Sequence, residues 1–133
     1  MDITRKSDYA IRMMTALAVA GASCPVSVRE LAKQQNVPYA FARSVARELT
    51  AAGLVSATRG AAGGLCLVQA PEDITLLQIV ETMQGRMTIA VCTNDPEWCV
   101  RSGRCSAHGV WVEADAAVRG LLERKTLAGL ATR

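Results

Sequence analysis

The chain has 133 residues, which is the size of one compact domain or of a small domain with an appended helix. Half of the residues are hydrophobic and only 4% are aromatic, and no apolar run approaches the ~20 residues of a membrane span, which argues against a transmembrane protein. The net charge is +3, but residues 1–60 carry eight Lys or Arg against four Asp or Glu and residues 61–133 carry seven against eight, so the first part is the one expected to meet a polyanion such as DNA.

Helical patterns dominate this basic first part. Apolar residues recur at steps of three and four in the first predicted helix. Ser27 and Glu30 form a capping box in front of the second helix, and Gly53 follows the third as a C-terminal glycine. The second and third helices are joined by a tight turn, and the third carries arginines on its outer face, which predicts a helix-turn-helix. The predicted helices cover residues 6–20, 28–34 and 38–52.

A β-hairpin is predicted directly after the third helix. Residues 54–58 alternate like a short strand, residues 59–64 are a glycine-rich turn, and residues 65–68 are the return strand. A hairpin in this place is the wing of a winged helix, so the expected fold is mainly α. A phosphate-binding loop is not favoured, because it needs a strand–loop–helix context and usually a Lys. The side chains expected to contact DNA are Tyr39, Ala40, Arg43, Ser44, Arg47 and Arg59.

Two further helices are predicted after the wing. Thr75 and Gln78 form a second capping box in front of an apolar helix that Gly85 ends. A long helix over residues 107–125 carries an apolar stripe that a second copy of the same helix would bury, which predicts a homodimer. The residues expected at or near this dimer contact are Trp111, Val118, Leu121 and Leu122.

The polar, turn-rich stretch between these two helices holds three of the five cysteines, and the only histidine follows it. This segment has little apolar surface of its own, and binding to one metal centre would order it. The expected ligands are Cys92, Cys99, Cys105 and His108. Zinc sites usually include two ligands two to four residues apart, so the wider spacings from Cys92 to Cys99 and from Cys99 to Cys105 favour a larger inorganic core. A zinc-stabilised DNA-binding protein and a thiol switch among the same three cysteines are the alternatives.

The two other cysteines receive no chemistry from the sequence. No secretory signal pattern is present, so we expect a cytoplasmic protein without a membrane partner. A reducing cytosol disfavours structural disulfides. Cys24 is therefore assigned no role, and Cys66 is interpreted as a small side chain on a strand. An enzyme is not expected either, because no nucleophile–base pair is evident and the one histidine serves better as a ligand.

Several stretches taken together resemble the winged-helix iron–sulfur transcription regulators of the IscR and NsrR type, the Rrf2 family. The resemblance extends over nearly the whole chain. The three-cysteine loop is one of the matching features, which are specific as a set. The other stretches that carry the resemblance are Ser7–Arg12, Gly53–Val55, Arg59–Gly60 with Gly63–Gly64, Ile74–Leu77 and Thr126–Leu130.

The resemblance implies a homodimeric repressor or activator that binds a roughly palindromic operator. Its cluster state would set DNA affinity in response to iron–sulfur status, redox stress or nitric oxide. The implied cofactor is an iron–sulfur cluster on the four residues of the cysteine stretch, with [2Fe–2S] favoured over [4Fe–4S]. Asp8 of the partner subunit is the alternative fourth ligand. The expected division is a DNA-binding winged helix over residues 1–85, a cluster-binding loop over residues 86–106 and a dimerisation helix with its cap over residues 107–133.

Overall fold

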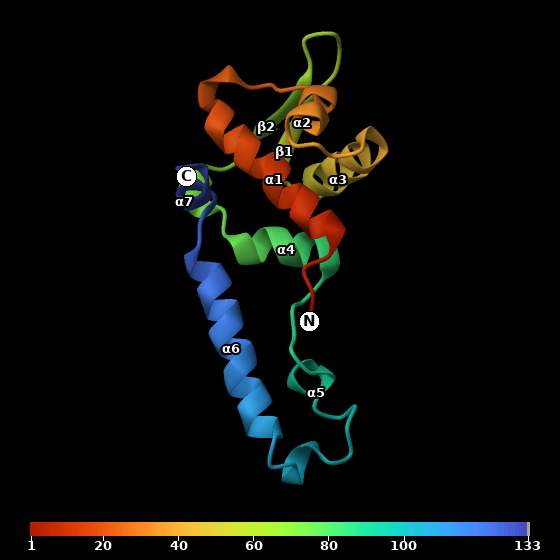
Figure 1. The fold of residues 1–133 in the computed structure, drawn as a ribbon, viewed down its shortest axis with the longest axis vertical. Coiled ribbons are helices and arrows are strands. Elements are labelled where there is room, and N and C mark those ends of the chain that lie inside the picture. Colours follow the sequence, from red (N-terminus) through yellow and green to blue (C-terminus); the bar gives the residue numbers. More distant parts are fainter. Residues whose placement is uncertain (133) are drawn as a thin grey trace.

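The structure is a computed structural model that describes residues 1–132 of the chain. Figure 1 shows an elongated molecule, with a winged-helix body at one end, the cysteine loop at the other and the long helix α6 between them. Among residues 1–132, no helix is long and apolar enough to cross a membrane. The elements are α1 (Arg5–Ala20), α2 (Val28–Gln34), α3 (Tyr39–Ala51), β1 (Val55–Thr58), β2 (Gly64–Leu67), α4 (Leu76–Gln84), α5 (Val91–Asn94), α6 (His108–Arg124) and α7 (Leu127–Ala131).

Polar side chains cap the helix starts where the sequence predicts them. Ser27 Oγ accepts a hydrogen bond of 3.0 Å from the N–H of Glu30, in front of α2. Thr75 Oγ1 accepts one of 3.1 Å from the N–H of Gln78, in front of α4. The Glu30 carboxylate, which a complete capping box would direct back to Ser27, instead accepts from the Gln34 side chain at 3.0 Å. Each such cap contributes about 1 kcal/mol. The predicted starts of α2 and α4 are confirmed, because both caps are present.

Helix α1 is the centre of the core, because it packs against α3, α4 and α7. Met13 and Met14 are fully buried on its inner side. The sequence allows either Phe41 or Ala42 to face inward from α3, and the structure buries Ala42 and leaves Phe41 54% exposed. Burying one large apolar side chain contributes about 1.5–3 kcal/mol, so this cluster is the main stabilising feature of the body. Its other large, fully buried members are Leu17, Leu31, Val45, Leu49, Leu54, Val55, Ile74, Ile79 and Leu127.

The wing is an antiparallel pair of β1 and β2, with Thr58 opposite Gly64 at the turn end. The segment before α2 adds to it through a bridge between Val26 and Leu65, whose reciprocal N–H···O distances are 3.1 and 2.8 Å. A side chain at Gly64 would overlap the Val26 carbonyl, so glycine allows the two backbones to approach this closely. The wing is therefore fastened to the helix-turn-helix at its base.

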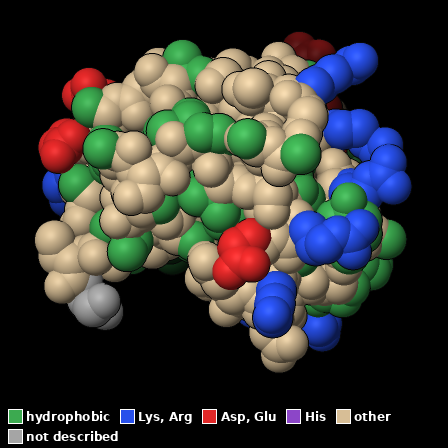
Figure 2. All heavy atoms as spheres, turned by 90° about the horizontal axis from the view of Figure 1, so that it is seen from above, with side chains coloured by type: hydrophobic (Ala, Val, Ile, Leu, Met, Phe, Trp, Pro, Cys, Tyr) green, Lys and Arg blue, Asp and Glu red, His purple; other side chains and the backbone are tan. Residues whose placement is uncertain are grey.

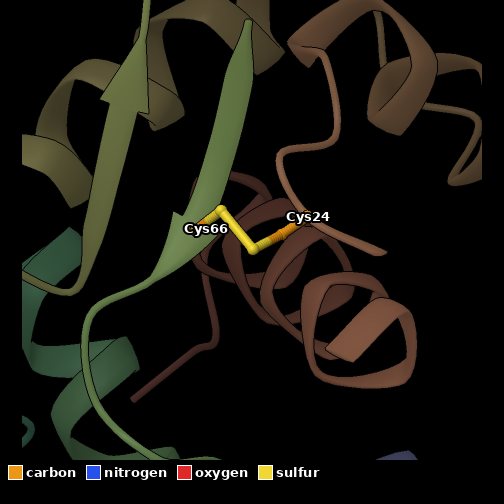
Figure 3. Close-up of a disulfide and its surroundings, with 2 residues drawn as sticks. All are labelled: Cys24 and Cys66. Carbon is orange, nitrogen blue, oxygen red and sulfur yellow. A yellow bond between two sulfur atoms is a disulfide. The ribbon is translucent and has the colours of Figure 1, made fainter. Parts of the chain in front are cut away.

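Cys24 and Cys66 form a disulfide, with their Cα atoms 5.3 Å apart (Figure 3). The sequence-based interpretation, which gave neither cysteine a partner, is therefore wrong. The two residues are 42 positions apart, and they meet because the Val26–Leu65 bridge lays the segment before α2 beside β2. A long-range backbone pairing of this kind leaves no local pattern in the sequence.

A polar junction joins α4, α6 and the start of the cysteine loop. Glu81 of α4 and Arg119 of α6 form an ion pair. Arg119 Nη1 also donates to the carbonyl of Met87 at 3.3 Å. The N–H of Ile89 donates to the buried carboxylate of Asp115 at 3.0 Å. The chain leaving α4 is thus held against α6 just before the cysteines begin.

The last helix, α7, returns to the body (Figure 1). The N–H of Leu127 donates to the carbonyl of Ile74 at 2.8 Å, and the N–H of Leu76 donates to the carbonyl of Lys125 at 2.8 Å. The Leu127 side chain is fully buried in the core beside α1. Helix α6 is therefore attached to the winged helix at its C-terminal end as well as through its contact with α4.

Candidate functional site

The outer side of α3 exposes Tyr39, Arg43 and Arg47. The Tyr39 ring has two guanidinium neighbours: Cζ of Arg29, from α2, lies 4.2 Å from the ring centroid and Cζ of Arg43 lies 5.8 Å from it. Such cation–π contacts hold the cations over the ring without neutralising them. Figure 2 shows Lys and Arg side chains gathered on the side of the molecule where α3 lies in Figure 1. This side presents positive charge on a rigid helix.

An open groove of about 510 Å³ runs between α3 and the wing. Arg43 and Arg47 lie on its lining, together with small and apolar side chains. Guanidinium groups on a groove beside an exposed helix suit contacts to phosphate oxygens, which position a DNA duplex. The other lining residues are Val28, Tyr39, Ala46, Thr50, Ala51, Ala57 and Leu65.

All six residues expected to contact DNA lie on α3 or on the wing. Arg59 is exposed where the wing turn begins, Ala40 is exposed and Ser44 is half-buried. Arg29 was not among the expected residues, although it belongs to the same basic surface. Its place in α2, out of phase with the inward pair Leu31 and Ala32, is the sequence signal that could have identified it.

The cysteine loop brings a thiol and the imidazole together. Cys92 lies on the short helix α5, His108 is the first residue of α6, and Sγ of Cys92 is 3.4 Å from Nδ1 of His108. Cys99 and Cys105 are free, half-buried thiols between these elements. Turns shape the connection, since the carbonyl of Cys99 accepts from the N–H of Ser102 at 3.0 Å and that of Cys105 from the N–H of His108 at 3.2 Å.

The donor set fits a soft metal or an iron–sulfur centre in its chemistry, because thiolates and imidazole are the usual ligands of such groups. In its geometry, the structure joins Cys92 with His108 only. Among the residues described, no three His, Cys, Asp or Glu side chains come close enough together to hold one metal ion. The loop is lightly packed, as the 91% exposure of Val100 illustrates. Cys99 and Cys105 are not among the residues of the buried core.

Asp8, the alternative ligand, lies on α1. Its Oδ2 accepts from Nη2 of Arg12 at 2.8 Å, and Nη1 of Arg12 donates to the carbonyl of Gln35 at 2.8 Å. Figure 1 shows α1 in the winged-helix body and α5 in the extension at the other end. Within one chain, Asp8 is thus part of a surface ion pair rather than of the cysteine loop.

Helix α6 leaves apolar side chains uncovered. Trp111 is 41% exposed and Leu121 is 48% exposed, whereas Val118 and Leu122 are half-buried. Leu122 packs inside the chain, against the small apolar cluster of Leu77, Val80 and Met87. The uncovered part of the expected dimer stripe is therefore its Trp111 and Leu121 side.

Comparison with known proteins identifies the family. Residues 3–133 match Rrf2, which is described as an iron-dependent transcriptional regulator. The chain is similar to the HTH-type transcriptional regulator NsrR of Halalkalibacterium halodurans, with 31% identity over 133 residues, 99% of this chain and 91% of the relative. The chain belongs to the Rrf2 family. Its fold is similar to that of CymR, the global cysteine regulator of B. subtilis, with a TM-score of 0.83, 27% identity and coverage of 99% and 97% of the two chains. It is also similar to T. potens IscR, with a TM-score of 0.78, 25% identity and coverage of 99% and 87%.

Membership of the Rrf2 family makes this protein a DNA-binding transcriptional regulator rather than an enzyme. The resemblance found in the sequence and the winged-helix fold are thereby confirmed. The matches extend through the cysteine loop and α6, not only through the winged helix.

Proposed function

We propose that this Rrf2-family regulator is a homodimer whose DNA binding is controlled by an iron–sulfur cluster held on residues 92–108. The observation that carries the proposal is the 3.4 Å approach of Cys92 Sγ to His108 Nδ1, on a loop with two more free thiols. The description of the family as iron-dependent supports an iron group over another metal. The loop, the winged helix and α6 would then act as sensor, reader and dimer contact.

Cys92, Cys99, Cys105 and His108 would hold the cluster. A [2Fe–2S] centre is favoured over [4Fe–4S], because nitrogen ligation is known for clusters of this type. When bound, the cluster supplies a group whose oxidation or loss responds to iron–sulfur status, redox stress or nitric oxide. The partner subunit's Asp8 is the alternative fourth ligand, and would link the cluster directly to α1.

The uncovered apolar side of α6 supports the homodimer. Trp111 and Leu121 are large side chains that a monomer leaves in water, and a two-fold contact would bury both copies at once. Two winged helices related by this axis would bind two half-sites about one helical turn apart, hence a roughly palindromic operator. Each α3 would enter the major groove, and Arg59 would reach the adjacent minor groove from the wing.

The polar junction at α6 supports a route from the loop to the winged helix. The N–H of Ile89, three residues before Cys92, is fixed by Asp115, and Arg119 one helical turn further on pairs with Glu81 of α4. Helix α4 packs against α1, the centre of the core. Ordering or disordering of the loop would therefore shift the packing of α4 and, through it, of α1, against which the helix-turn-helix packs.

A thiol switch or a zinc site without a cluster is the second candidate. The Cys92–His108 contact favours it as well, because a thiol and an imidazole are both usual zinc ligands. The two candidates differ in colour, since an iron–sulfur centre absorbs visible light and zinc or a disulfide does not.

Anaerobic purification with a visible spectrum and analysis of iron and acid-labile sulfide tests the proposal. We expect visible absorbance and equal amounts of iron and sulfide. Cys99→Ala should lose both, and His108→Ala should shift the spectrum or lose the cluster. Ser106→Ala, an exposed neighbour in the same loop, is the matched control and should change neither.

Two results would contradict the proposal. A colourless protein that carries zinc would favour the structural metal site, and an unchanged cluster in Cys99→Ala would remove the ligand set. A normal spectrum in His108→Ala together with cluster loss in Asp8→Ala would transfer the fourth position to Asp8.

A further inference from the structure

The disulfide between Cys24 and Cys66 lies in the winged-helix body, at the wing (Figure 3). We propose that this pair is a reversible dithiol–disulfide site whose oxidation state sets the freedom of the wing and, through it, the affinity for DNA. The site uses none of the loop cysteines and no metal. It therefore stands or fails separately from the iron–sulfur proposal.

A backbone pairing beside the bond brings the two cysteines close together. Val26 lies two residues after Cys24, and Leu65 directly precedes Cys66; these two neighbours pair through hydrogen bonds of 3.1 and 2.8 Å. Disulfides need Cα atoms about 4.4–6.8 Å apart. The observed 5.3 Å falls inside this range. Because this bridge does not depend on the sulfur atoms, we expect it to keep the reduced thiols near each other, so that the bond can form again.

Small reagents can reach the pair. Both cysteines are half-buried rather than enclosed in the core. A cavity of about 210 Å³ opens beside Cys24, between the end of α1 and the chain that follows β2. This volume admits the reactive end of a low-molecular-weight thiol or disulfide. The other residues that line it are Leu17, Ala18, Gly21, Leu67, Gln69 and Pro71.

The chemistry balances with a small-molecule disulfide, RS–SR, as oxidant. The thiolate of Cys24 attacks one sulfur of RS–SR, which breaks that bond, forms a mixed disulfide and releases RS⁻, which takes up the proton that Cys24 gave up. The thiolate of Cys66 then attacks Sγ of Cys24 and releases the second RSH. Two electrons and two protons pass from the protein to the reagent, and an excess of RSH reverses both steps.

The bond ties β2 to the segment that leads into α2, so it restrains the wing relative to the helix-turn-helix. These two parts share a groove of about 360 Å³ on the DNA-facing side. A restrained wing has less conformational freedom to lose when DNA binds. We therefore expect the oxidised form to bind DNA more tightly. The groove is lined by Ser27, Arg29 and Tyr39 from the helix-turn-helix and by Thr58, Gly60 and Gly64 from the wing.

The first test uses the full chain with Cys92, Cys99 and Cys105 changed to Ser, so that only this pair can react. The protein is equilibrated with mixtures of oxidised and reduced glutathione, and free thiols are counted by alkylation and mass spectrometry. We expect both thiols to appear and disappear together at intermediate ratios. A bond that excess reduced glutathione does not open, or thiols that oxidised glutathione does not join, would overturn the proposal.

Hydrogen exchange of the same two forms measures the wing. Amides of residues 58–66 should exchange at least severalfold more slowly in the oxidised form. Amides of α4, which is remote from the bond, serve as the internal control and should not change. Equal hydrogen-exchange rates of the wing amides in both forms would show that the disulfide does not change the mobility of the wing, and would also overturn the proposal.

The second test measures DNA binding with the loop cysteines intact. The probe is a duplex enriched from a random-sequence pool by the wild-type protein. Cys24→Ser and Cys66→Ser should each bind this duplex about fivefold more weakly than disulfide-bonded wild type, at equal metal content. Thermal unfolding identifies a variant that fails to fold. In that case the DNA affinity of the other cysteine variant tests the proposal. Wild-type affinity in a folded variant would contradict the proposed link between this bond and DNA.

Discussion

Arg43 and Arg47 place two guanidinium groups on the exposed side of α3, at the groove beside the wing. A guanidinium that pairs with the guanine edge through two hydrogen bonds discriminates between bases by about 1–3 kcal/mol. One that binds a phosphate raises the affinity for every sequence and makes binding depend on salt. An arginine whose loss relaxes sequence preference contacts a base, and one whose loss weakens the salt dependence of binding contacts a phosphate.

We expect Arg43→Ala and Arg47→Ala each to weaken binding to the enriched duplex by about 1–3 kcal/mol while the fold stays intact. Fluorescence anisotropy at two salt concentrations would measure the loss. Arg124→Ala, an exposed arginine at the C-terminal end of α6 and outside the α3–wing groove, is the matched control and should bind as wild type does. Unchanged binding in both α3 variants would move the DNA interface to another surface.

Glu81 makes the junction between α4 and α6 sensitive to pH. Burial alone would raise the pKa of Glu81, but hydrogen bonds from Arg119 and from the N–H of Met87 outweigh it and lower the pKa below its ordinary value of 4.5. The carboxylate is thus favoured by folding. Its contribution to stability is present above pH 4.5 and is lost as the pH falls through the lowered pKa of the folded state.

Glu81→Gln should lower the free energy of unfolding by roughly 1–3 kcal/mol at neutral pH, because it removes a charge-assisted hydrogen bond. The difference from wild type should shrink as the pH falls below 4.5. Urea unfolding at several pH values would measure it. Glu123→Gln, an exposed residue of α6, is the control. A difference that stays constant with pH would show that the Glu81 charge is not the cause.

The base of the wing depends on the close approach of the β2 backbone at Gly64 to the segment before α2. A Cβ on Gly64 would overlap the Val26 carbonyl and the Ser27 N–H, whereas a Cβ on Gly103 meets nothing within 4 Å. Gly64→Ala should therefore cost about 1–3 kcal/mol in the free energy of unfolding and should loosen the wing. Gly103→Ala should have little effect. Chemical denaturation of the two variants compares them, and equal stabilities would contradict this account of the wing base.

Helix α6 offers a cleaner test of dimerisation at Leu121 than at Leu122. Leu122 packs inside the chain, so Leu122→Asp would damage the fold as well as the contact. Leu121 is 48% exposed, and Leu121→Asp should give a folded monomer in sedimentation with an unchanged circular dichroism spectrum. Glu123→Ala should remain a dimer. A wild-type dimer in Leu121→Asp would place the interface elsewhere.

At the scale of the whole molecule, the sequence predicts the features that local patterns carry. Caps at Ser27 and Thr75 and helical periodicity determine the helices, and the alternation around the glycine turn predicts the wing. Features that depend on long-range packing were not predictable. The Cys24–Cys66 disulfide follows from a backbone bridge across 42 positions, and the return of α7 to the body follows from hydrogen bonds at Leu127.

The proposed site shows the same limit. The residue types and their spacing predict a soft-metal donor set on the cysteine loop, and of its four members the structure brings Cys92 and His108 into contact. The positions of Cys99 and Cys105 depend on the group that the loop would bind, because metal ligation rather than apolar burial would order such a segment. The sequence therefore predicts which residues form the donor set but not how they are arranged in space.

The most direct test of cluster-controlled DNA binding is the dissociation constant for the enriched duplex, measured at one salt concentration for cluster-loaded and cluster-free wild type. Both samples should be dimers with the same circular dichroism spectrum, so that the cluster is the only difference. We predict affinities that differ by at least about fivefold, the usual lower range of coupling between two sites. Equal affinities in the two states would contradict the claim that the loop controls the DNA-binding face.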